Sequence, residues 1–148
     1  MIREGKKLPV DVMTNVPAVV SKVADDRDVV ALYAFGSLAN GKLKPLSDLD
    51  FGVLLSNALD RKERFKKSID LLGIFNSTLK TDEVDLVILN DGPLRFACNI
   101  IKTGKLLFCR DRSRLADFIE KTIKQYLDFK PVRERFDREF LKGIGYHG

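Results

Sequence analysis

Three aspartates and a glycine–serine turn are the residues of this sequence whose types and spacing could do chemistry. Asp48 and Asp50 stand two positions apart at the start of an apolar run. Ten residues separate Asp48 from Ser37, which follows Gly36. Because side chains alternate along a strand, Asp48, Asp50 and Gly52 are expected on one face of a sheet. Both carboxylates can then bind the same ion, and Gly52 is expected to leave room for a ligand.

The third acid is Asp85, which interrupts an otherwise apolar stretch over residues 84–89. A carboxylate on a buried face is costly unless hydrogen bonds or a cation compensate it, and a divalent cation would hold all three acids ionised. The alternative is that Ser47 and Asp48 only form a turn before the second strand. The three acids and the glycine–serine turn together favour a metal site over that alternative.

Oxygen ligands of this kind suit magnesium, or manganese, rather than zinc. Two such ions about 4 Å apart would stabilise the attacking and leaving oxygens of an in-line displacement at phosphorus. The acceptor would be a hydroxyl group, and Asp85 is placed to accept its proton. Asp48, Asp50 and Asp85 are therefore the predicted catalytic and metal-binding residues.

The turn after the first apolar strand allows two interpretations as a phosphate-binding motif. Residues 36–42 match most of the G-x-x-x-x-G-K-[ST] pattern of a P-loop, but Leu43 stands where a hydroxyl should bind magnesium. Pro45 also forbids the long helix that a P-loop presents to phosphates. The favoured interpretation is a tight bend at Gly36, with the Ser37 hydroxyl and nearby N–H groups facing a triphosphate.

Composition narrows the classes of protein that remain. The chain has 148 residues, 45% hydrophobic and 32% charged, with a net charge of +5 and no apolar run long enough to span a bilayer. Cys98 and Cys109 lack disulfide or zinc spacing, and His147 is the only histidine. A cytosolic, reduced protein is expected, in which carboxylates that bind hard cations carry the chemistry. The basic run at residues 61–67 reads as a solvated helix face, so direct nucleic-acid binding is not expected.

Hydrophobic periodicity predicts alternating helices and strands. Pro17 is suited to a first helical turn, and the apolar residues of the longest helix are expected on one core-facing side: Phe65, Ile69, Leu72, Phe75 and Leu79. The expected order is helix 16–23, strand 29–35, helical turn 38–40, strand 50–55, helix 59–80, strand 84–90, helix 94–102, strand 105–109, helix 115–126 and a further helical segment 132–143.

This order predicts an α/β (α+β) fold, a small mixed β-sheet flanked by helices, in which the first two strands pair antiparallel. The whole chain, residues 1–148, is expected to be one domain. Within it, residues 1–10 form a loose leader and residues 111–148 a C-terminal helical segment.

The pattern of Gly36-Ser37, ten residues, Asp48-Leu49-Asp50 and a later strand acid resembles the DNA polymerase β-like nucleotidyltransferase superfamily. More narrowly, it resembles the minimal nucleotidyltransferase (MNT) branch. The resemblance implies magnesium-dependent use of a nucleoside triphosphate and transfer of a nucleotidyl group with release of pyrophosphate. It implies that Asp48 and Asp50 are metal ligands, that Asp85 is the third carboxylate, and that the glycine–serine pair contacts the triphosphate.

One position departs from the family pattern. Relatives often carry an arginine just before the second glycine of the turn, where this chain has Asn40. Lys42 or Lys44 would then supply the positive charge to the triphosphate.

The resemblance also implies a partner and an acceptor. Many stand-alone MNT proteins are antitoxins that transfer AMP from ATP to a tyrosine of a HEPN-domain ribonuclease toxin. Such a pair implies ATP and the toxin as partners, with the basic and aromatic residues of segment 133–140 as a docking surface. Two alternatives stay open at this point: neutralisation of a partner by binding and occlusion alone, and nucleotidyl transfer to a small-molecule hydroxyl.

Overall fold

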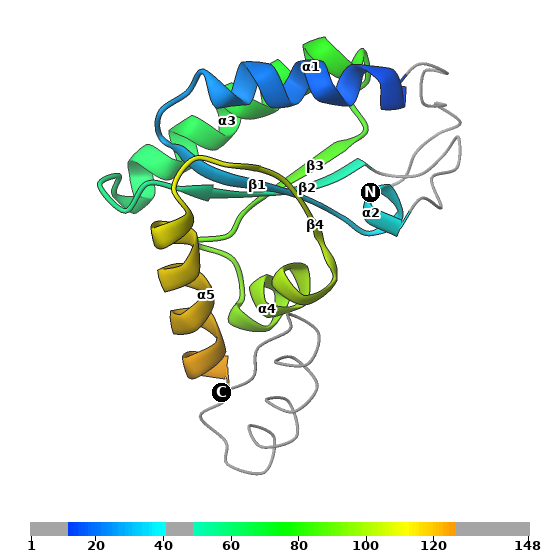
Figure 1. The fold of residues 1–148 in the computed structure, drawn as a ribbon. Coiled ribbons are helices and arrows are strands. Elements are labelled where there is room, and N and C mark those ends of the chain that lie inside the picture. The colour runs from blue at the N-terminus through cyan, green and yellow to red at the C-terminus, as the bar shows by residue number, and fades with distance from the viewer. Residues whose placement is uncertain (1–11, 41–48, 127–148) are drawn as a thin grey trace.

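The computed structural model describes residues 12–40 and 49–126 of the chain (Figure 1). Its elements follow in the order α1 (Val12–Ala24), β1 (Val29–Phe35), α2 (Ser37–Asn40), β2 (Leu49–Leu55), α3 (Arg61–Leu79), β3 (Val84–Ile88), α4 (Leu94–Thr103), β4 (Lys105–Cys109) and α5 (Arg112–Tyr126). The predicted leader and the segment 132–143 lie outside the described residues.

The strands form one four-stranded sheet in the order β3-β2-β1-β4. β1 is antiparallel to both β2 and β4, whereas β2 and β3 are parallel. A parallel pair needs a crossover, and α3 supplies it between β2 and β3. The predicted mixed sheet with an antiparallel first pair is therefore confirmed.

Helices α1 and α3 cover one face of the sheet, and α4 and α5 lie on the other (Figure 1). On the first face, Phe51 of β2 packs edge-on to Phe75 of α3, with ring centroids 4.7 Å apart. Helix α3 begins with a capping box, in which Asp60 accepts from the Glu63 N–H and Glu63 accepts from the Asp60 N–H. It ends at Lys80, which adopts a left-handed conformation.

The prediction for the core side of α3 was wrong at its first two positions. Phe65 and Ile69 are 66% and 57% exposed, whereas Leu71, Phe75 and Leu79 are fully buried. At 100° per residue, Phe65 and Ile69 lie about 80–120° around the helix from Phe75. The pattern of apolar residues three or four apart could not separate these two neighbouring sides.

The other face explains a second correction, at Gly52 of β2. A Cβ atom built there would lie 3.2 Å from Leu89 Cδ2 and 3.6 Å from two carbons of Ile100. The space is therefore filled by protein rather than left for a ligand, because α4 packs closely on β2. A third correction concerns Pro17, which lies inside α1 rather than in its first turn.

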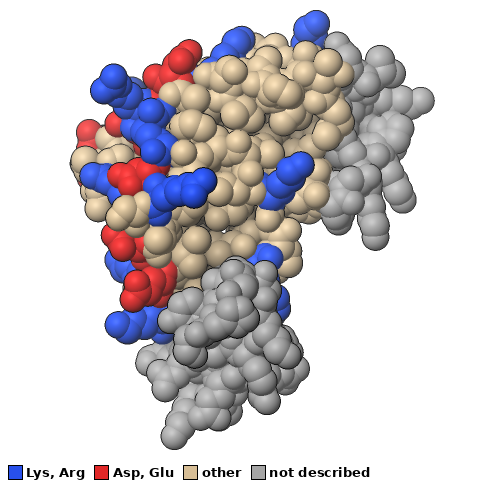
Figure 2. Space-filling model, viewed as in Figure 1, with Lys and Arg blue, Asp and Glu red and all other residues tan. Residues whose placement is uncertain are grey.

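The basic start of α3 is a solvated helix face, as predicted, with Arg61, Lys62 and Lys66 exposed. Positive and negative side chains are intermixed along one edge of the described surface in Figure 2. Lys67 bridges two acids, with its Nζ 3.0 Å from Asp26 Oδ2 and 3.1 Å from Asp28 Oδ2. Within the described residues, none of the helices has the length and apolarity to cross a membrane.

Candidate active site

Two of the predicted acids lie side by side across neighbouring strands. Asp50 of β2 pairs in register with Asp85 of β3 on one side and with Phe35 of β1 on the other. Paired residues of adjacent strands project to the same face, about 4.8 Å apart. The sheet itself therefore brings the two carboxylates together on the face toward α4, although more than thirty residues of chain separate them.

Gly36 shapes the space beside Asp50. It follows β1 with a φ of 64°, and a Cβ atom built there would lie 2.6 Å from Asp50 Oδ2. An L side chain at this position would be strained and would also displace the carboxylate. The short helix α2 follows, with the Ala39 N–H donating to the Gly36 carbonyl at 3.2 Å. The predicted tight bend at Gly36 is thus present, directly against an acid.

The side chains of three predicted site residues are not among those that the structure describes. Asp48 and Lys42 lie outside the described residues, and of Ser37 only the backbone is described. Among the described residues, no three histidine, cysteine or acidic side chains come together as a metal site. The three-carboxylate arrangement and the triphosphate contacts of Ser37 and Lys42 therefore stay predictions.

The sequence predicted that Asp85 lies on a buried face, and this prediction was wrong. Asp85 is exposed, and it is the second residue of β3, an edge strand of the sheet. No described cation forms an ion pair with it. Its pairing with Asp50, rather than a penalty of burial, is what marks it as a candidate functional residue.

These acids fit a hard divalent cation. Asp50 and Asp85 present oxygen donors on one face, and the missing side chain of Gly36 leaves the Asp50 carboxylate room to lie beside the bend. Carboxylate oxygens are the donors that magnesium and manganese prefer. Asp50 and Asp85 would thus be two ligands of such an ion, and the third ligand expected from the sequence, Asp48, stays a prediction.

Sequence reasoning did not single out Glu83, a buried acid two positions before Asp85. Glu83 is 5% exposed, and its carbonyl accepts from the Leu49 N–H at 3.0 Å. This bond joins the start of β3 to the start of β2 next to the acids. The alternation of Glu83, Val84 and Asp85 was the available signal, because it puts two acids on one side of an extended chain.

Comparisons with known proteins identify the family. The sequence profile described as "Polymerase beta, Nucleotidyltransferase" matches residues 19–113, which include Gly36, Asp50 and Asp85. The chain belongs to the polymerase β nucleotidyltransferase family. No curated protein matches it in sequence.

Several solved structures share the fold of this nucleotidyltransferase. It resembles a chain of a toxin–antitoxin crystal structure with AMP-PNP, at 25% identity and a TM-score of 0.58, covering 85% of this chain and 95% of that one. It also resembles a chain of a tri-AMPylated Shewanella oneidensis HEPN toxin in complex with an MNT antitoxin, at 25% identity and a TM-score of 0.56, covering 86% and 97%. A chain of the toxin–antitoxin complex MntA–HepT matches at 23% identity and a TM-score of 0.58, covering 86% and 97%.

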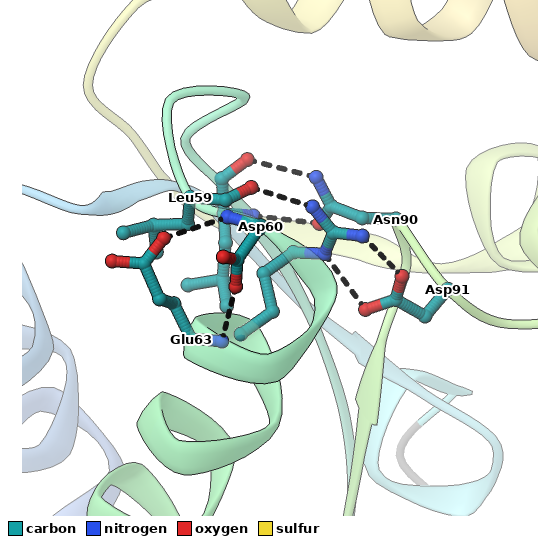
Figure 3. Close-up of polar contacts among 7 residues, drawn as sticks. Leu59, Asp60, Glu63, Asn90 and Asp91 are labelled. Atoms are coloured by element: carbon teal, nitrogen blue, oxygen red, sulfur yellow. Dashed lines mark hydrogen bonds and ion pairs between the residues drawn. The ribbon is translucent and has the colours of Figure 1, made fainter.

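The opposite end of the same strands in this nucleotidyltransferase is held by paired polar groups (Figure 3). Just after β3, the side-chain amide of Asn90 binds the backbone of Leu55 at the end of β2. Its Oδ1 accepts from the Leu55 N–H and its Nδ2 donates to the Leu55 carbonyl, both at 2.9 Å. Arg64 of α3 binds both carboxylate oxygens of Asp91, at 2.8 and 2.6 Å, and donates to the Leu59 carbonyl. The hydrogen bond from Arg64 holds the pKa of Asp91 below its usual value.

Proposed function

We propose that this nucleotidyltransferase is a protein adenylyltransferase antitoxin, which transfers AMP from ATP to a tyrosine of a HEPN-domain ribonuclease toxin and releases pyrophosphate. The observation that carries the proposal is the in-register pair of Asp50 and Asp85 beside the bend at Gly36. The likeness to chains of complexes with AMP-PNP and with an AMPylated HEPN toxin supports ATP and the toxin as substrates.

In the proposed reaction, the phenol oxygen of the tyrosine attacks the α-phosphorus of ATP. The bond from that phosphorus to the oxygen bridging to the β-phosphate breaks, and pyrophosphate leaves with the electron pair. Asp85 accepts the phenol proton, because its exposed carboxylate on the edge strand can be reached by a side chain of another protein. Gly36, Ser37 and Lys42 contact the triphosphate.

Asp48, Asp50 and Asp85 would together hold magnesium, with two ions expected and manganese as a substitute. When bound, such ions neutralise the triphosphate and the leaving pyrophosphate. Asp50 would position these ions beside the triphosphate, because its carboxylate lies against Gly36. A cytosolic location, expected because Cys98 and Cys109 are free, stays a prediction.

The decisive experiment is incubation of the protein with its HEPN partner, magnesium and ATP labelled at the α-phosphate. We expect label on a tyrosine of the partner, and none with Asp50→Asn. Asp70→Asn is the matched control, because Asp70 is an exposed acid on α3 away from the acid pair. If the wild-type protein leaves the toxin unlabelled and Asp50→Asn still neutralises it, AMP transfer is contradicted and neutralisation by occlusion is established instead.

A further inference from the structure

An aromatic pair adjoins the two acids on the side of Gly36. Phe35 is the last residue of β1 and pairs with Asp50, so its ring projects to the face that carries the carboxylates. Phe96 of α4 packs edge-on to Phe35, with ring centroids 5.5 Å apart and an interplanar angle of 88°. Phe96 is nevertheless 38% exposed. A large apolar ring thus remains partly open to solvent next to a polar site.

The order of residues across the sheet gives the site two different flanks. Asp85 lies on the edge strand β3, Asp50 on β2 and Phe35 on β1, toward the middle of the sheet. The Asp50 carboxylate lies against Gly36, which also belongs to the β1 side. A triphosphate over Gly36 therefore lies on the aromatic flank, whereas an acceptor from another protein approaches along the free edge at Asp85.

The position of Phe96 is fixed before any ligand binds. Its N–H donates to the Pro93 carbonyl at 3.0 Å in the first turn of α4. The preceding turn is held by the Arg64–Asp91 ion pair and by the Asn90 bonds to β2. Edge-to-face contact with Phe35 then limits the motion of the ring. Little conformational entropy remains to be lost when a flat ligand packs on it.

We propose that Phe96, supported by Phe35, is the surface on which the base of the bound nucleotide stacks. The inference rests on the proposed function, because it assumes that a nucleoside triphosphate is bound at Gly36 and the acids. Stacking of a base on an aromatic side chain tolerates any base, since every base has a π-face. Phe96 thus contributes affinity for the nucleoside part of ATP and does not touch the triphosphate.

The test is direct binding of ATP and of inorganic tripolyphosphate, each with magnesium, to the full chain without toxin, measured by calorimetry. We expect Phe96→Ala to weaken ATP binding roughly 5- to 100-fold and to leave tripolyphosphate binding unchanged. Phe96→Trp should retain ATP affinity because it keeps an aromatic surface. Phe65→Ala is the matched control, since Phe65 is an exposed ring on α3 and should leave both affinities unchanged.

Each result has a distinct meaning. Equal ATP affinity of the wild type and Phe96→Ala overturns the stacking proposal, and so does an equal loss for ATP and tripolyphosphate, which would show a general disturbance of the site. Phe96→Leu, which keeps an apolar side chain, should lose ATP affinity at an unchanged Tm; retained affinity would also overturn the proposal. A wild-type protein that binds neither ligand removes the proposed function itself.

Discussion

Two aspartates near the ends of β3 have opposite surroundings. Asp91, in the turn after the strand, accepts two hydrogen bonds from the Arg64 guanidinium, one on each carboxylate oxygen. Asp85, at the start of the strand, is exposed and faces another acid across the sheet instead of a cation. Two residues of the same type, at the two ends of the same strand, can therefore have different roles. An acid satisfied by a protein cation fixes structure, whereas an exposed acid on an edge strand, paired with a half-buried acid on the next strand, is suited to an external cation and a reaction.

Removing the charge of each aspartate in turn tests the different roles of Asp85 and Asp91 most directly. Asp85→Asn should lower AMP transfer to the toxin about 10²- to 10⁴-fold, because it removes a proton acceptor, with little change in stability. Asp91→Asn should leave the rate of transfer within about threefold, since it lies at the other end of the strands. Initial rates with labelled ATP and Tm values of both variants check this. A slow Asp91→Asn enzyme or a fully active Asp85→Asn enzyme would contradict the division of roles.

Substitution of Gly36 tests the geometry of the end of the sheet that carries the proposed catalytic acids. Gly36→Ala places a methyl group 2.6 Å from Asp50 Oδ2, too close for the carboxylate to keep its position, and strains a backbone with a φ of 64°. We expect transfer to fall about tenfold or more, and the free energy of unfolding to fall by about 1–2 kcal/mol. Gly73→Ala is the control, because a Cβ at that helix position meets no atom within 4 Å. It should be stabilising by a few tenths of a kcal/mol up to about 1 kcal/mol.

Removal of the cation at the other end tests the structural role. Arg64→Ala should lower the free energy of unfolding by about 1–2 kcal/mol, measured by urea titration at pH 7, because it leaves the partly buried Asp91 without its partner. Nucleotide transfer should change little. A loss of transfer larger than the loss of folded protein would mean that this end also takes part in the reaction.

The same ion pair predicts a pH dependence. The folded-state pKa of Asp91 is lowered by its hydrogen bond to Arg64, so the contribution of Asp91 to stability is complete above the unfolded pKa of about 3.9. It is lost as pH falls through the lower folded pKa. The difference in unfolding free energy between wild type and Asp91→Asn should therefore stay constant from about pH 7 to 5 and shrink below about pH 4. A difference that grew on acidification would contradict this sign.

The smallest effect is expected at the exposed start of α3. Phe65→Ala should change the free energy of unfolding by less than about 0.5 kcal/mol, because its ring is 66% exposed. Phe75→Ala on the same helix should cost about 3–5 kcal/mol, since Phe75 is fully buried against Phe51. Similar losses from both substitutions would show that the two sides of the helix are not distinguished as described.

Much of this fold follows from local patterns. The strand that ends at Phe35, the strand that begins with the acids and the helix between β2 and β3 were predicted close to their observed bounds. The errors arose where several patterns fit equally well. Phe65 and Ile69 repeat at helical spacing but lie beside the buried stripe, and Gly52 looked open because packing by α4 cannot be read from β2 alone.

By itself, the sequence determined which residues could do the chemistry and the type of element that carries each of them, because periodicity and turn residues act over a few positions. Only the tertiary structure decided which of these residues are neighbours. The register that sets Asp50 between Phe35 and Asp85, the contact of Gly36 with that carboxylate and the pairing of Arg64 with Asp91 all join distant parts of the chain. Such contacts depend on strand pairing and helix packing across the whole sheet, and no local pattern encodes them.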